Sequence, residues 1–177
     1  MVRKVSQALC ERRTQFVHFP TSRQEQRETT RVFFERLGFP GVVGAIDGTH
    51  IPIKNPGGDT QALYISRKNF HSLNVQLVCD ADEKITNVVA RWRGSAHDNR
   101  IWEESNLREK FAANEVNGVL LGDNGYACSW HLLTHVLSAQ ARTPEDACNR
   151  AHTSTRNVIK RVNGQMKNRF RCLIKKM

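Results

Sequence analysis

No apolar run in this sequence approaches the ~20 residues that a helix needs to cross a bilayer. The first residues, which include Arg3, Lys4 and Glu11, also lack the apolar core of a secretory signal peptide. Pro (5) and Gly (11) are scarce, and a hydrophobic content of 39% argues against disorder. We therefore expect a folded, soluble protein inside the cell that has no membrane partner.

Paired cysteines are absent as well. The five cysteines are odd in number, widely scattered and contain no C-x-x-C pair, so neither a disulfide framework nor a zinc ribbon is indicated. They are expected to be reduced. The spacing of Cys128, His131 and His135 leaves a zinc site open as an alternative to ordinary helix residues, but the sequence places no fourth ligand.

Acidic residues are missing from the whole segment Ala147 to Met177. This segment carries nine of the positive charges in a chain whose net charge is +10. A basic stripe of this kind is typical of phosphate binding, so DNA is the expected partner. The alternative is a solvated basic face without a ligand. The nine residues are Arg150, Arg156, Lys160, Arg161, Lys167, Arg169, Arg171, Lys175 and Lys176.

The patterns that remain predict a mixed α/β domain. At 177 residues the chain fits one domain that buries roughly 70% of its surface on folding. We expect residues 1–40 to form a helical lead-in and residues 41–177 the main domain. Apolar and alternating runs predict strands at 42–46, 71–80, 85–92 and 119–121. Helical patterns cover 2–16, 22–37, 98–111, 130–137 and 154–170, with a loop at 138–149, and a capping box of Ser22 and Glu25 begins the second helix.

Three carboxylates stand where these elements begin or end. Asp47 follows the apolar run 42–46 and precedes a predicted Gly-Thr-His turn, and Asp123 follows the run 119–121. Asp98 begins a helix. Buried acids are costly unless they are paired or bind a metal, so we expect Asp47 and Asp123 to lie close together at neighbouring strand ends with Asp98 near them. Taken singly, each acid is better explained as a turn former or helix cap, and only the three acids together favour a metal site.

Ordered sequence blocks resemble those of the PIF/Harbinger-type DDE transposases and the Harbinger transposase-derived nucleases. The blocks are GVVGAIDGTHI, HSLNVQLVCD, GSAHDN, LLGDNGY and RNVIKRVNGQMKNRFRCL. The resemblance implies a ribonuclease-H-like mixed sheet flanked by helices, in which acids bind a divalent cation, Mg²⁺ or Mn²⁺, for endonuclease chemistry on DNA. It implies Asp47 and Asp123 as catalytic acids and Asp47, Asp98 and Asp123 as metal ligands.

One residue departs from the family pattern. Where the resemblance implies the last catalytic Glu, this sequence has Lys160, which puts a cation where a dication would bind. At ~4 Å and an effective dielectric of ~20, such a like-charge contact costs on the order of 4 kcal/mol. We expect the ammonium of Lys160 to pair with Asp47 or Asp123 instead of a metal.

Three functions therefore stay open. The first possibility is a transposase-derived nuclease, either weakened or active through a substitute ligand. Alternatively it is a catalytically inactive derivative that binds DNA or protein, with Arg156, Lys160, Arg161, Lys167 and Arg169 as candidate DNA contacts. The third possibility is a decayed transposon copy. By resemblance we also expect a separate Myb-like DNA-binding partner, a nuclear and also cytoplasmic location, and a fold truncated at its C-terminus.

Overall fold

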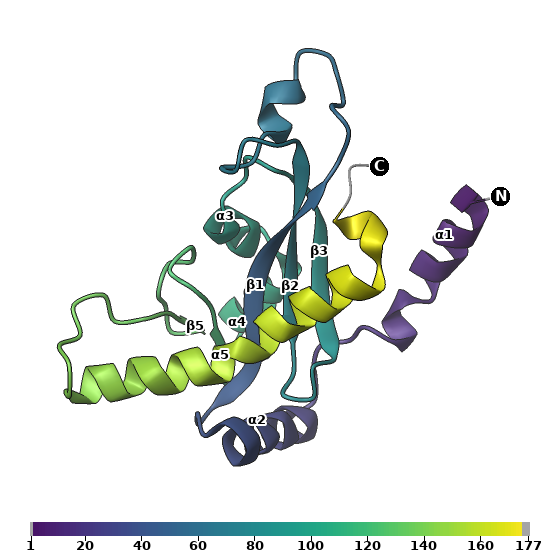
Figure 1. Ribbon diagram of the computed structural model, residues 1–177. Helices are drawn as coiled ribbons and strands as arrows, with labels where there is room; N and C mark the ends of the chain where they lie inside the picture. Colours follow the sequence, from purple (N-terminus) through teal and green to yellow (C-terminus); the bar gives the residue numbers. More distant parts are fainter. Residues whose placement is uncertain (1, 175–177) are drawn as a thin grey trace.

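The computed structural model describes residues 2–174 and places a five-stranded sheet at the centre of the molecule (Figure 1). The strand order is β3-β2-β1-β4-β5. β1 is antiparallel to β2 and parallel to β4, so the sheet is mixed. This confirms the predicted α/β, ribonuclease-H-like fold class. The strands are β1 (Val42–Pro52), β2 (Ser72–Cys79), β3 (Ile85–Arg93), β4 (Val119–Leu121) and β5 (Leu132–Leu133).

Helices cover both faces of the sheet. On one face α2 (Arg23–Leu37) and α5 (Pro144–Arg169) pack Phe33 and Ile159 into a core shared with Leu77. On the other face α3 (Asp98–Glu103) and α4 (Asn106–Ala112) pack Trp102 and Phe111. In Figure 1, α5 runs across the front of the sheet, whereas α1 (Val2–Glu11) stands apart from it. Because successive strand residues face opposite sides, β1 supplies both cores.

Several helix and strand signals in the sequence are confirmed. Ser22 and Glu25 form the predicted capping box at the start of α2, since Ser22 Oγ accepts from the backbone N–H of Glu25 at 3.2 Å and Glu25 Oε2 accepts from that of Ser22 at 2.9 Å. Gly38 ends α2 in the left-handed conformation, with φ of 79°. The predicted strands at 71–80, 85–92 and 119–121 all form.

Other predicted elements are wrong. Gly48, Thr49 and His50 form no turn, because β1 continues through them while pairing with β2 as far as Pro52. Residues 130–137 are not helical and contain β5, and the segment 98–111 divides into α3 and α4 at Ser105, which caps α4. The segment 138–149 is not wholly loop, because Thr143 caps α5 and Pro144 occupies its first turn.

Two sequence expectations concern the C-terminal end and the domain boundary. Lys175, Lys176 and the C-terminal end, where a truncation is expected, lie outside the described residues. The predicted boundary after residue 40 falls in the turn between α2 and β1 and stays a prediction. No helix within residues 2–174 is long and apolar enough to cross a membrane. The five cysteines, all within these residues, are free thiols.

Candidate active site

Asp47 lies at an open edge of the sheet. β4 pairs with β1 only from Val42 to Ala45, so the edge of β1 beyond Ala45 is left uncovered by β4. Asp47 shares the face of β1 that carries Ala45 and therefore points toward α5, while Gly48 faces α3. Because β4 ends before this point, the Asp47 carboxylate lies beside α5, the helix that crosses this edge.

Arg156 on α5 contacts two acids, Asp47 on β1 and Asp123 in the loop that follows β4. Its Nη2 lies 2.5 Å from Asp47 Oδ1 and 3.3 Å from Asp123 Oδ2. The Arg156 and Asp47 side chains are 6% and 17% exposed, whereas that of Asp123 is 41% exposed. A single guanidinium nitrogen therefore brings together the two acids that the sequence predicts to be neighbours.

The other oxygen of Asp47 is also held by α5. Asn163 Nδ2 donates to Asp47 Oδ2 at 2.9 Å, and one turn further Lys167 Nζ donates to the backbone oxygen of His50 at 3.1 Å. Asn163 and Lys167 follow Arg156 at helical spacing. The polar side chains on this side of α5 therefore form one stripe that faces Asp47 and the adjoining part of β1. Asn163 was not predicted in this role, although its helical spacing from Arg156 is visible in the sequence.

Lys160 belongs to the same stripe but does not replace a metal. Its side chain is exposed, and within the described residues it forms no ion pair. The cation that pairs with Asp47 and Asp123 is Arg156, one helical turn earlier, so the expected pairing by Lys160 is wrong. The longer, forked guanidinium at the preceding turn reaches both carboxylates, and Lys160 is left facing solvent.

Asp98 joins the cluster from α3. Asn74 Nδ2 on β2 donates to Asp98 Oδ1 at 2.7 Å. A Cβ placed on Gly48 would come within 2.6 Å of Asp98 Cγ, and one placed on Gly125 would lie 3.3 Å from Asp98 Oδ2 and 2.8 Å from Asp123 Oδ1. Two glycines therefore make the space in which Asp98 approaches the other acids. We call Asp47, Asp98 and Asp123 the acid cluster.

The electrostatics of the acid cluster favour an added cation. Burial raises the pKa of Asp47, and the neighbouring charges of Asp123 and Asp98 raise it further, while Arg156 opposes them. Burial likewise raises the pKa of Tyr126, with Asp98, Asp47 and Asp123 adding to the effect. The three carboxylates thus repel one another, and the one guanidinium beside them pairs with only two, Asp47 and Asp123.

The donor set suits a hard divalent cation. Carboxylate and carboxamide oxygens are ligands of Mg²⁺, and within residues 2–174 the buried oxygens Asn163 Oδ1, Asn74 Oδ1 and Tyr126 Oη have no hydrogen-bond partner. However, no group of three His, Cys, Asp or Glu side chains in that part of the chain is already arranged as a metal site. Arg156 bridges Asp47 and Asp123, so a dication at this site would compete with its guanidinium for the same oxygens. The zinc alternative at Cys128, His131 and His135 is not assembled among the described residues either.

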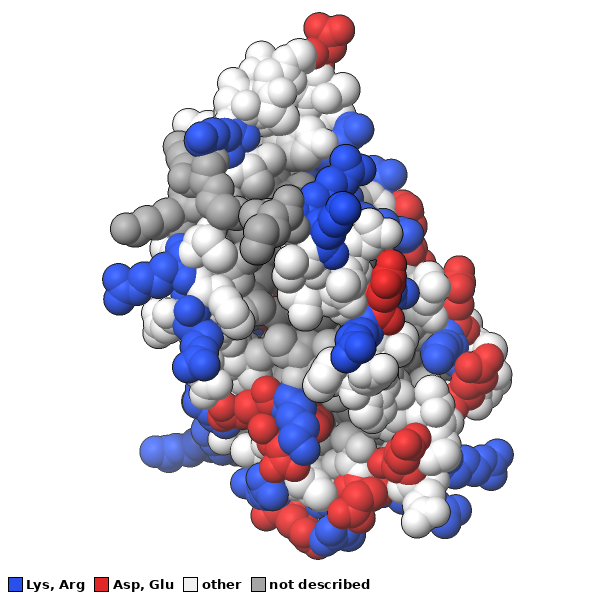
Figure 2. Space-filling view, turned by 90° about the vertical axis from the view of Figure 1, so that its right-hand side faces the viewer, with Lys and Arg blue, Asp and Glu red and all other residues white. Residues whose placement is uncertain are grey.

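The candidate DNA contacts on α5 occupy different surroundings. Arg156 is buried against the acids, and Arg161 Nε pairs with Glu83 Oε1 at 2.6 Å. Lys167 is half-buried, whereas Lys160 and Arg169 are exposed. Figure 2 shows Lys and Arg interspersed with Asp and Glu at the lower end of the molecule, where α2 lies. Because Arg156 and Arg161 are paired with acids, α5 presents fewer unpaired basic side chains than its sequence indicates.

Comparison with known proteins decides the family. A family model described as DDE superfamily endonuclease matches residues 46–177. The chain belongs to this family. The motif resemblance to Harbinger transposase-derived proteins is thereby confirmed. Endonucleases of this superfamily generally use divalent metal ions.

Individual relatives support the same placement. "Putative nuclease HARBI1" is 36% identical to the chain in Rattus norvegicus and 34% identical in Homo sapiens, each over 175 residues. "Protein ALP1-like" of Arabidopsis thaliana is 25% identical over 156 residues, which are 79% of this chain and 38% of the relative. The HARBI1 alignments cover 97% of this chain and 49% of the relatives, so the chain spans about half their length. No solved structure matches the chain.

Proposed function

We propose that this member of the DDE superfamily is a transposase-derived endonuclease that depends on Mg²⁺ or Mn²⁺ and acts on DNA phosphodiester bonds. The observation that carries the proposal is the convergence of Asp47, Asp98 and Asp123 from three separate elements at one open sheet edge. The HARBI1 relatives, whose name describes a nuclease, support the reaction class.

This proposal assigns roles to the residues of the acid cluster and to Arg156. Asp47 and Asp123 would hold the cation once Arg156 releases them, and Asp98, fixed by Asn74, would complete the ligand set. When bound, such a cation activates water and stabilises the leaving oxygen of the phosphodiester. Once released from the acids, Arg156 would supply a positive charge beside the phosphate, which suits the added negative charge of the transition state.

A second candidate function is favoured by the same ion pair. Arg156 already neutralises Asp47 and Asp123, and the last catalytic acid is replaced by Lys160. A catalytically inactive derivative that retains DNA or protein binding would tolerate both features. In either case, the motif resemblance supports a separate Myb-like protein as the source of DNA sequence recognition and the nucleus as the place of action.

The test is nicking of supercoiled plasmid in Mg²⁺ or Mn²⁺. We expect nicking by the wild-type chain that is lost with EDTA and in Asp47→Asn and Asp123→Asn. Asp59→Asn, which changes an exposed loop acid, is the matched control and should retain activity. Nicking that survives both cluster substitutions would contradict the proposal, and binding of DNA without any nicking would support the inactive derivative.

A further inference from the structure

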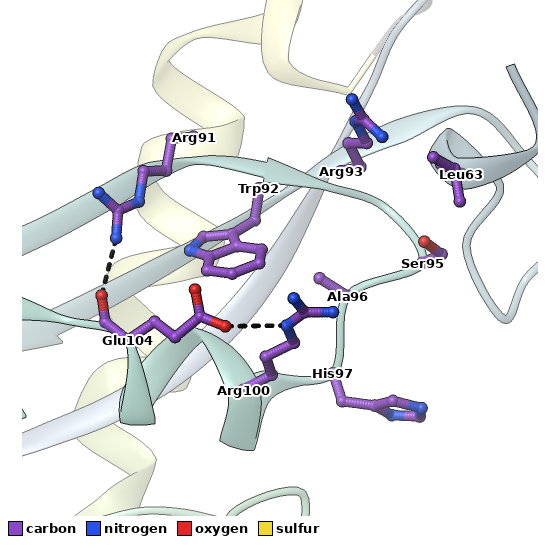
Figure 3. A pocket seen from close by; sticks show the side chains of 9 residues that line it. All are labelled: Leu63, Arg91, Trp92, Arg93, Ser95, Ala96, His97, Arg100 and Glu104. Atoms are coloured by element: carbon purple, nitrogen blue, oxygen red, sulfur yellow. Dashed lines mark hydrogen bonds and ion pairs between the residues drawn. The ribbon is translucent and has the colours of Figure 1, made fainter. Parts of the chain in front are cut away.

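An open groove lies between the end of β3 and α3, outside the acid cluster (Figure 3). Its volume of ≈ 440 Å³ is within the range of small-ligand sites. Three arginines and an apolar wall line it, and the only acid among the lining residues, Glu104, is paired. We call this the β3 groove, and its principal residues are Leu63, Arg91, Trp92, Arg93, Ala96 and Arg100.

The arginines of the β3 groove are held in place while keeping donors free. Arg91 Nη2 donates to the backbone oxygen of Glu104 at 2.7 Å, and Arg100 Nε donates to Glu104 Oε1 at 3.0 Å. Their guanidinium carbons lie 5.8 Å and 5.3 Å from the centre of the Trp92 ring. Each guanidinium has five N–H donors, so most of these donors remain available to a ligand.

Arg93 and Trp92 complete this arrangement. The guanidinium of Arg93 lies over the ring of Tyr64, with 5.6 Å from its carbon to the ring centre. Trp92 is partly exposed, and its indole N–H is buried without an acceptor among the described residues. Guanidinium groups fixed in this way are suited to a phosphate, whose oxygens they bind through paired N–H groups.

The β3 groove adjoins the acid cluster directly. Asn74 Nδ2 donates both to the backbone oxygen of Ala96, in the groove wall, and to Asp98 Oδ1, at 3.0 Å and 2.7 Å. Asp98 follows the groove residue His97 in the chain. A polymer bound in the groove would therefore pass next to the carboxylates, whereas a small molecule would gain nothing from this proximity.

We propose that the β3 groove binds an unpaired nucleotide of the DNA strand that leads into the acid cluster. Arg93 and Arg100 bind its phosphates, and its base lies against the apolar wall formed by Leu63, Trp92 and Ala96. An unpaired strand is favoured because only unstacked bases offer a face to such a wall. The inference rests on the proposed action on DNA and adds the place where the strand is held.

Fluorescence anisotropy with a labelled oligo(dT) in EDTA tests this inference without cleavage. Arg93→Ala/Arg100→Ala should weaken binding at least about tenfold and make the plot of log affinity against log salt shallower by about 1.4. Trp92→Leu should weaken binding about 5- to 150-fold with little change in that slope. The matched controls are Arg23→Ala/Arg27→Ala on α2 and Trp130→Leu, whose side chain is 92% exposed, and they should bind like wild type.

Each result separates the inference from the proposed function. Groove variants that bind like wild type would overturn the inference even if the wild-type chain nicks DNA. Loss of binding in the groove variants alone would support it even if the wild-type chain never nicks DNA. Tighter groove-dependent binding of oligo(U) than of oligo(dT) would overturn the assignment to DNA. Circular dichroism of every variant checks that the fold is intact.

Discussion

Arg156 and Asp47 form the most buried ion pair among the described residues, with side chains only 6% and 17% exposed. The pair joins α5 to β1 across a separation of 109 residues in the chain. The ion pair therefore stabilises the packing of α5 on β1, and it also occupies a carboxylate oxygen that a metal would need. Which of these roles dominates determines whether the chain is an enzyme.

We predict that Arg156→Ala destabilises the fold by about 3–5 kcal/mol, because it leaves Asp47 buried without its cation. Urea unfolding measures the loss. Arg169→Ala, at an exposed position of the same helix, is the control and should change stability by less than about 0.5 kcal/mol. Adding Asp47→Asn to Arg156→Ala should recover part of the stability, and failure to do so would show that the ion pair is not the cause.

Lys160→Glu should strengthen divalent-metal binding about tenfold, because it adds a carboxylate to the polar stripe of α5 beside the acid cluster. Titration calorimetry with Mn²⁺ measures the change. Lys4→Glu on α1 makes the same charge change away from the acids and should leave the affinity unaltered. Equal effects of the two substitutions would mean that only overall charge matters.

Gly48→Ala should displace Asp98 and abolish metal-dependent nicking, because its Cβ would overlap the Asp98 carboxylate. Gly164→Ala is the contrasting control, since nothing lies within 4 Å of its added Cβ on α5. That control should raise stability by roughly 0.5–1 kcal/mol through helix propensity and leave nicking unchanged. Wild-type nicking by Gly48→Ala would remove Asp98 from the site.

The Glu83 carboxylate should make stability depend on pH. Hydrogen bonds from Arg161 and Gln165 lower the pKa of Glu83, so its ionised form is favoured in the folded state. The contribution of ionised Glu83 to the free energy of unfolding is fully present above the pKa of the unfolded state. It is lost as pH falls through the lower pKa of the folded state. Glu83→Gln should thus lower Tm at neutral pH, and the difference from wild type should vanish in strong acid. Glu115→Gln, at an exposed acid that forms no ion pair among the described residues, is the matched control.

The sequence predicted the fold where local signals and packing agree. The capping box of α2 and the alternation of β2 specify their elements locally, and both formed. The Gly-Thr-His segment after Asp47 reads as a turn by composition, yet pairing with β2 keeps it in β1. Leu132 and Leu133 became β5 because they align with the edge of β4, a contact that no local pattern reveals.

The acid cluster was foreseeable as a group of residues but not as an electrostatic arrangement. Strand ends and the family motif placed Asp47 and Asp123 together. The identity of their cation depends on which turn of α5 lies above β1, and that is fixed by the packing of Val158, Ile159 and Val162. Arg156 was consequently interpreted as a DNA contact and Lys160 as the partner of the acids.

Calorimetric titration of Mn²⁺ into three forms of the chain tests the central claim, that the acid cluster is a cation site for which Arg156 competes. The account predicts weak binding by wild type, tighter binding by Arg156→Gln and none by Asp47→Asn. Absence of binding by both wild type and Arg156→Gln, or unchanged binding by Asp47→Asn, would contradict it.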